Sequence, residues 1–316
     1  MGINRSKVAL LAAIGLTGLA FCLVVATPAF AGISCRYVAA GTDGPAGNRL
    51  EIKVTRFEEV VALLPGNGAN IQVVDDQRMK RLGCRGGRPT MLNIDRVDFS
   101  AGRRATGSTL FIDEAPKFGP GATPASAGGK GISFFAKGPS LSFGISGTAG
   151  DDLVRMGMDG KAAALDFFPD VFPESEAGDN IDARIFAKFV NLLVKSGDGA
   201  DQVAGSQIDL SNTWFDRPLG VPASIYGEGG PDYLLGGTNM DYLDGGPGAD
   251  FLTGGSGDDQ LFGGGGVDTF IAGPGNDTID TIDGRPDEEI RCGRGFDLAS
   301  MDLQDNDLDC ESFRFP

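Results

Sequence analysis

From Gly227 the chain repeats every nine residues, and this period constrains the fold more than any other feature of the sequence. In register the six units read GEGGPDYLL, GGTNMDYLD, GGPGADFLT, GGSGDDQLF, GGGGVDTFI and AGPGNDTID. Position eight is always large and apolar, and positions one, two and four are nearly all Gly. Position six is always acidic, at Asp232, Asp241, Asp250, Asp259, Asp268 and Asp277. One unit cannot bury its single apolar side chain but stacked units can, so the period predicts a β-solenoid.

Stacking places the aspartates of alternate units on one edge of the solenoid. If two units form one coil, like strands lie about 4.8 Å apart. Neighbouring carboxylates at that distance repel by about 1 kcal/mol in water and by more in a less polar medium. A Ca²⁺ ion removes this repulsion, because it accepts six to eight oxygens at about 2.3–2.6 Å, backbone carbonyls included. Mg²⁺ requires stricter octahedral geometry, so it fits a flexible Gly-rich turn less well.

The pattern therefore predicts up to about four calcium ions in the main array, since alternate units form four Asp pairs. The pairs are Asp232 with Asp250, Asp241 with Asp259, Asp250 with Asp268, and Asp259 with Asp277. Candidate carbonyl ligands are the position-four glycines Gly248, Gly257, Gly266 and Gly275. Asn239 replaces the glycine at position four and should weaken the pair that uses Asp241. Glu228, at position two, is either a further ligand or a solvated surface charge.

The charge distribution favours a cation as ligand and argues against nucleic acid. The net charge is −16, and residues 226–316 carry 20 acidic but only 4 basic residues. Residues 32–225 carry 23 acidic and 21 basic residues. Nucleic-acid binding needs a basic surface, so it is not expected. The chain has no His, which excludes Ser-His-Asp catalysis and imidazole metal sites and leaves oxygen ligands.

These units resemble the RTX, or hemolysin-type, calcium-binding repeat G-G-x-G-x-D-x-U-x of secreted bacterial proteins. The resemblance implies a parallel β-roll or β-helix that binds calcium ions. Degraded copies upstream place Asp152 and Asp201 at position six, so we add both to the candidate ligands and expect irregular coils before Gly227. The tail from Cys292 to Glu311 is similar to the disulfide-closed ends of such proteins. We interpret it chiefly as a polar cap on the last strand edge, with extra cation ligands as the alternative.

We expect an all-β chain with five parts: a signal peptide (1–31), an N-terminal β region (32–130), irregular solenoid coils (131–226), the calcium-binding array (227–283) and a C-terminal cap (284–316). The positive start and apolar run predict export with cleavage after Ala31, an uncleaved membrane anchor being the alternative. After cleavage no stable membrane span is expected. Residues 182–195 are expected to form one or two strands rather than a helix.

Four cysteines remain after cleavage and allow three disulfide connectivities. Two lie near the mature start and two near the end of the chain, which favours Cys35–Cys84 and Cys292–Cys310. The pairing favoured here would staple the first strands and close the cap.

The sequence contains no recognisable catalytic motif. The function we expect is calcium binding by a secreted, non-catalytic protein with neither catalytic nor cofactor-binding residues. The alternative is a small secreted, Ca²⁺-dependent carbohydrate-active enzyme similar to β-helix lyases, with Arg or Lys as base. A cell-surface or polysaccharide partner is left open.

Overall fold

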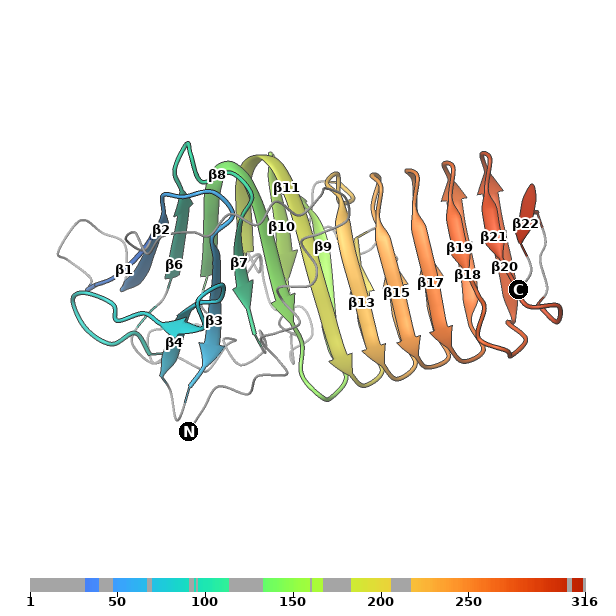
Figure 1. Ribbon diagram of the computed structural model, residues 1–316, viewed down its shortest axis with the longest axis horizontal. Coiled ribbons are helices and arrows are strands. Elements are labelled where there is room, and N and C mark those ends of the chain that lie inside the picture. Colours follow the sequence, from blue (N-terminus) through green and yellow to red (C-terminus); the bar gives the residue numbers. More distant parts are fainter. Residues whose placement is uncertain are drawn as a thin grey trace, which may run out of the picture.

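The computed structural model describes residues 32–39, 48–66, 70–90, 94, 96–113, 133–159, 161–166, 183–205, 217–305 and 309–314. These residues form an elongated all-β solenoid, with the C-terminus at the far end of the stack (Figure 1). The predicted signal peptide, residues 1–31, lies outside the described residues. Within them, no helix is long and apolar enough to cross a membrane.

One parallel column of strands runs along the length of the solenoid. Its strands are β2 (Arg49–Val54), β3 (Val60–Pro65), β6 (Arg96–Ala101), β7 (Ser108–Ile112), β8 (Ser133–Ser146), β11 (Ala183–Asp198), β13 (Ala223–Gly229), β15 (Tyr242–Pro247), β17 (Gln260–Gly265), β19 (Thr278–Asp280), β21 (Leu298–Ser300) and β22 (Ser312–Arg314). The long strand β8 pairs with β6 through its first half and with β7 through its second half. The parallel sheet therefore continues from the N-terminal strands into the repeat array.

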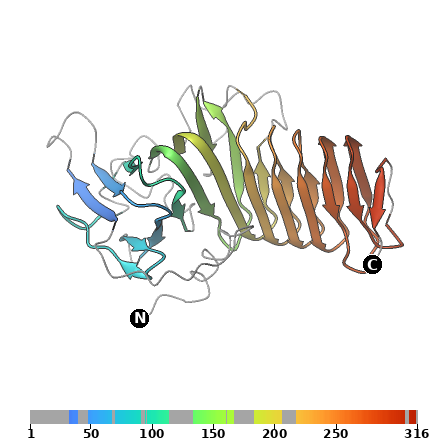
Figure 2. The ribbon, with the colours of Figure 1, turned by 45° about the horizontal axis from the view of Figure 1, so that its top comes forward.

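A second parallel column lies opposite the C-terminal part of the first (Figure 2). It contains β9 (Leu153–Asp159), β12 (Gln202–Ala204), β14 (Tyr233–Leu235), β16 (Phe251–Thr253), β18 (Thr269–Pro274) and β20 (Glu289–Arg294). Leu234 pairs with Leu252, and Leu252 with Phe270, so one coil is two nine-residue units as predicted. The next coil is longer, because Phe270 pairs with Ile290.

Antiparallel strands occur only toward the N-terminal end of the described chain. They are β1 (Ile33–Val38), which pairs with β2; β4 (Ile71–Asp75), which pairs with β3; β5 (Lys80–Arg81), which pairs with β4; and β10 (Ala162–Asp166), which joins β9 to β11. Residues 183–198 form the single strand β11, so the expectation of a strand rather than a helix there is confirmed.

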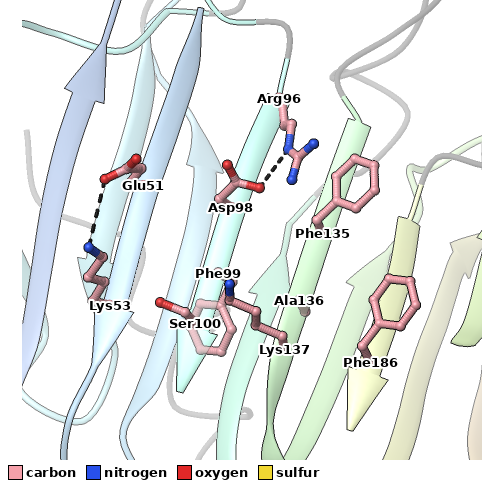
Figure 3. A pocket seen from close by; sticks show the side chains of 10 residues that line it. All are labelled: Glu51, Lys53, Arg96, Asp98, Phe99, Ser100, Phe135, Ala136, Lys137 and Phe186. Carbon is pink, nitrogen blue, oxygen red and sulfur yellow. Dashed lines mark hydrogen bonds and ion pairs between the residues drawn. The ribbon is translucent and has the colours of Figure 1, made fainter. Parts of the chain in front are cut away.

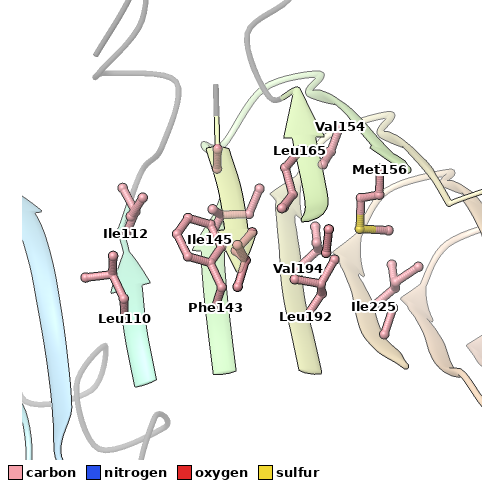
Figure 4. Packing of buried hydrophobic residues seen from close by; sticks show 14 of the residues in the cluster. Leu110, Ile112, Phe143, Ile145, Val154, Met156, Leu165, Leu192, Val194 and Ile225 are labelled. Atoms are coloured by element: carbon pink, nitrogen blue, oxygen red, sulfur yellow. The ribbon is translucent and has the colours of Figure 1, made fainter. Parts of the chain in front are cut away.

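The core is a continuous apolar interior between the two columns. All six position-eight side chains of the array are fully buried: Leu234, Leu243, Leu252, Leu261, Phe270 and Ile279. Burying each of them stabilises the fold by roughly 1.5–3 kcal/mol. Upstream, larger side chains such as Phe143 and Met156 fill the wider coils (Figure 4).

Both predicted disulfides are present. Cys35 bonds to Cys84, with a Cα–Cα distance of 4.6 Å, and Cys292 bonds to Cys310, with a Cα–Cα distance of 5.0 Å. The first joins β1 to the segment that follows β5. The second closes the last coil, where β21 pairs with the terminal strand β22.

Candidate metal centre

The position-six aspartates form two hydrogen-bonded ladders along the turns. In each ladder the carboxylate Oδ1 of one Asp accepts a hydrogen bond from the backbone N–H of the Asp one coil earlier. The Asp232 amide donates to Asp250 at 2.8 Å, and the Asp241 amide donates to Asp259 at 2.8 Å. The ladder that precedes the second column contains Asp152, Asp201, Asp232, Asp250, Asp268, Asp287 and Asp305. The other contains Asp241, Asp259, Asp277, Asp297 and Glu311.

The structure thus brings together all four predicted Asp pairs, with a backbone amide bridging each. This contact differs from the direct opposition of carboxylates that the sequence predicted. The bridging amide satisfies one oxygen of every pair and leaves the second oxygen for another partner.

That second oxygen is the distinctive feature of the site. The Oδ2 atom is buried and accepts no hydrogen bond in seven aspartates: Asp201, Asp232, Asp250, Asp259, Asp277, Asp287 and Asp297. Their side chains are almost fully buried; Asp250 is 2% exposed and Asp259 is 1% exposed. A buried carboxylate oxygen without a partner is costly, and buried charges are normally paired or bound to metal. The seven atoms are therefore suited to hold a cation.

Glycine at position one leaves space beside these oxygens. A Cβ atom added to Gly245 would lie 2.4 Å from Asp250 Oδ2 and 2.7 Å from the carbonyl oxygen of Gly263. At Gly254 it would lie 2.6 Å from Asp259 Oδ2 and 2.7 Å from the carbonyl oxygen of Ala272. An unpaired carboxylate oxygen and the carbonyl oxygen of a position-one residue thus face the same small space in two consecutive units.

The predicted position-four glycines lie in the same turns. Among the described residues, the carbonyls of Gly248, Gly257, Gly266 and Gly275 accept no backbone hydrogen bond. A Cβ on Gly266 would lie 1.4 Å from the Gly248 carbonyl oxygen, so this close stacking requires glycine. These carbonyls are free to act as ligands, whereas the nearby Oδ1 atoms are already hydrogen-bonded.

The unit with Asn239 differs from the others. Asp241 Oδ2 accepts a hydrogen bond from the Gly237 amide at 2.6 Å, so both of its oxygens have protein partners. This contact agrees in direction with the expectation that Asn239 weakens the pair using Asp241.

Glu228 follows the second of the two interpretations made from the sequence, because its side chain is an exposed surface charge, 43% accessible to solvent. Its carboxylate forms an ion pair with Lys195 Nζ at 3.2 Å, and its backbone has a φ of 71°. It takes the glycine conformation of position two and uses its charge to neutralise a lysine.

The ladders continue beyond the residues predicted from the sequence. Asp287 lies outside the nine-residue period and was missed, because a longer coil separates it from Asp268. Asp297, assigned to the polar cap, carries the same unpaired oxygen as the array. The sequence pattern that could have identified it is Gly293-x-Gly295-x-Asp297-x-Ala299. This is a repeat unit with Cys292 in place of the glycine at position one. Upstream, Asp201 shares the unpaired oxygen, but Asp152 Oδ2 accepts hydrogen bonds from Thr148.

No group of three or more Asp, Glu or Cys side chains converges as a metal cluster in the described part of the chain. A cation between coils would therefore take the rest of its ligands from backbone carbonyls and water, as Ca²⁺ does in flexible loops. The donors are all oxygens, which excludes a thiolate or imidazole site at these turns and fits a hard cation.

Burial raises the pKa of these carboxyl groups. The pKa of Asp250, Asp259, Asp277 and Asp287 rises from 3.8 to about 7, mainly through desolvation, with a smaller contribution from neighbouring carboxylates. The pKa of Asp232 and Asp241 rises to about 6 for the same main reason. Without a cation, these carboxyl groups therefore take up a proton at higher pH in the folded turns than they do in water.

We therefore expect acid to substitute in part for metal. A raised folded-state pKa contributes stability that is complete below about pH 3.8 and is lost as the pH rises through about 7. In chelator, far-UV circular dichroism should show more β structure at pH 5 than at pH 8. With saturating calcium this difference should largely disappear. A metal-free chain whose β signal is larger at pH 8 than at pH 5 would contradict this.

Comparison with known proteins supports the same assignment. The model of the RTX calcium-binding nonapeptide repeat (4 copies) matches residues 224–252 and 244–279. No curated protein matches the chain. The matched residues are the turns and short strands β13 to β19, where the paired aspartates lie. Residues 224–279 are therefore RTX-type calcium-binding repeats, and this part of the chain folds as a parallel β-roll.

Proposed function

We propose that the protein binds several Ca²⁺ ions between successive Gly-rich turns, and that these ions stabilise the β-roll. The observation that carries this proposal is the repetition of one buried, unpaired carboxylate oxygen along both ladders. The residues that would hold the ions are Asp232, Asp250, Asp259, Asp268 and Asp277. Backbone carbonyl oxygens would complete the coordination of each ion. They would come from the position-four residues Gly248, Gly257, Gly266 and Gly275 and from the position-one residues that lie beside Oδ2. Asp241 would contribute more weakly.

The same reasoning extends the calcium-binding region in both directions. Asp201 at one end and Asp287 and Asp297 at the other have the unpaired Oδ2 of the array. Asp152 would contribute less, because Thr148 occupies its Oδ2. Charge supports divalent cations over monovalent ones, since the C-terminal segment has 20 acidic residues against 4 basic ones.

We further propose that the protein is secreted and that its role is structural or adhesive rather than catalytic. RTX-repeat proteins are typically exported, and the apolar N-terminal run supports a signal peptide. The alternative, a Ca²⁺-dependent carbohydrate-active enzyme, has its own test. Incubation of acidic polysaccharides with the mature protein and calcium should yield no shortened products, and turnover abolished by replacing an arginine outside the array would favour the enzyme.

Isothermal titration calorimetry tests the calcium proposal directly. Mature, metal-free protein should bind several Ca²⁺ ions per chain, and millimolar Mg²⁺ should not displace them. Failure to bind Ca²⁺, or an equal response to Mg²⁺, would overturn the proposal.

A further inference from the structure

A groove of about 370 Å³ crosses the outer face of the N-terminal sheet, far from the calcium turns. It lies over β2, β6, β8 and β11, which are neighbours in one parallel sheet (Figure 3). Alternate residues of these strands face inward, and Ile52, Phe99 and Ala136 are buried. The residues between them face the groove, so the sheet presents one regular outer surface.

Strand register arranges the outward side chains in rows across the sheet. Lys53 pairs with Ser100, Ser100 with Lys137, and Lys137 with Phe186. The two lysines are thus two strands apart, about 9.6 Å between backbones. A second row on the same face, two residues before the first along each strand, contains Glu51, Asp98 and Phe135.

Cations are in excess in this groove although the chain is acidic. Asp98 forms an ion pair with Arg96 at 2.6 Å, and Glu51 forms one with Arg49 at 3.1 Å. Both carboxylates are therefore neutralised by arginines. Lys53 lies 4.0 Å from Glu51, and Lys137 is exposed and has no ion pair among the described residues. Lys137 is therefore available to bind an anion, and Lys53 adds a second positive charge to the same row beside its 4.0 Å ion pair with Glu51.

Aromatic side chains lie beside these lysines. Phe186 is 48% exposed, next to Lys137 on the neighbouring strand. Phe135 lies under the Arg96 guanidinium, 3.8 Å from the ring centroid. Pockets that recognise small ligands combine an apolar wall with a few charged groups. The C–H face of a sugar ring packs well on such a phenyl ring, and a sugar carboxylate pairs with a lysine.

We propose that this groove binds a uronate-containing polysaccharide, with a pyranose ring on Phe186 and the carboxylate of a sugar at Lys137 and another at Lys53. Lys53 and Lys137 lie in one row across the strands, so a linear polysaccharide that crosses the sheet could place a carboxylate at each of them. Nucleic acid is a poorer candidate, because it needs a broad basic surface, whereas this chain has a net charge of −16. The site is separate from the calcium proposal and does not depend on it.

The test is calorimetric titration of the calcium-saturated mature protein with a defined galacturonate hexamer, too short to gel with calcium. The wild type should bind the hexamer, and added NaCl should weaken the binding because the lysines are exposed. Lys137→Ala and Phe186→Ala should each weaken it several-fold, and the double variant should weaken it by about tenfold or more.

Two matched substitutions outside the groove serve as controls. Lys161→Ala and Phe296→Ala remove exposed side chains of the same kinds and should change the dissociation constant less than twofold. Equal circular dichroism in calcium confirms that each variant is folded. No binding of the hexamer, equal binding of an uncharged glucose hexamer, or a double variant that binds as the wild type does would overturn the proposal.

Discussion

Removing calcium from the mature protein is expected to unfold most of the β-roll between β13 and β21. Each carboxylate whose pKa rises from 3.8 to about 7 loses on the order of 4 kcal/mol when it is ionised in the fold. Four groups have this shift: Asp250, Asp259, Asp277 and Asp287. Their combined penalty is of the same order as the roughly 5–15 kcal/mol that stabilises a typical domain. At pH 8 the metal-free array should therefore be largely unfolded.

Far-UV circular dichroism during a titration from EGTA to excess Ca²⁺ measures this change. The β signal should rise cooperatively with Ca²⁺ and respond little to Mg²⁺. Hydrogen exchange read by mass spectrometry should show protection gained in residues 223–305 and little change in β2 and β3. The N-terminal strands serve as the internal control, because they contain none of the ladder aspartates. A metal-free array as protected as the calcium-loaded one would contradict the prediction.

Replacing Asp250 and Asp259 together by Asn is expected to remove at least half of the bound calcium. Each residue belongs to two of the four pairs of the array, so the double variant leaves none of these four pairs with both carboxylates. Asparagine keeps an oxygen that can accept the amide hydrogen bond from Asp232 or Asp241. The variant therefore separates the cation-binding role of Oδ2 from the structural role of Oδ1.

Calcium stoichiometry and the midpoint of calcium-induced folding report the effect of the double variant. The midpoint should move to calcium concentrations at least tenfold higher, because fewer charged ligands bind each ion. Asp280→Asn is the matched control, since Asp280 lies in the array on β19 but outside both ladders. Replacing the same two residues by Ala should also break the ladder and lower stability in acid. If the double Asn variant retained wild-type stoichiometry, the assignment of these residues as ligands would be wrong.

The repeat array was predictable because its constraints are local and periodic. The spacing of Asp250 and Leu252, repeated at Asp268 and Phe270, fixes the strand, its inward residue and the coil length together. Successive side chains of a strand point to opposite faces, so a shift of one position would turn the apolar side chain away from the core. The disulfides followed from the positions of four cysteines near the two ends.

What the sequence did not reveal depends on irregular coils or on distant segments. Asp287 lies in a coil lengthened by two residues, and its buried partner Ile290 is three positions away rather than two. The amide bridge between carboxylates is a backbone geometry that spacing does not encode. The outer groove depends on the register of β2, β6, β8 and β11, which repeat no motif. Lys137 and Phe186 are far apart in the chain and lie side by side only because β8 and β11 pair.

The number of calcium ions bound by the purified mature protein tests the central claim most directly. Native mass spectrometry, checked by elemental analysis, counts them without an assumption about folding. Four pairs in the array predict up to about four Ca²⁺ there, with more if Asp201, Asp287 and Asp297 also bind. One ion or none at millimolar calcium would contradict the account.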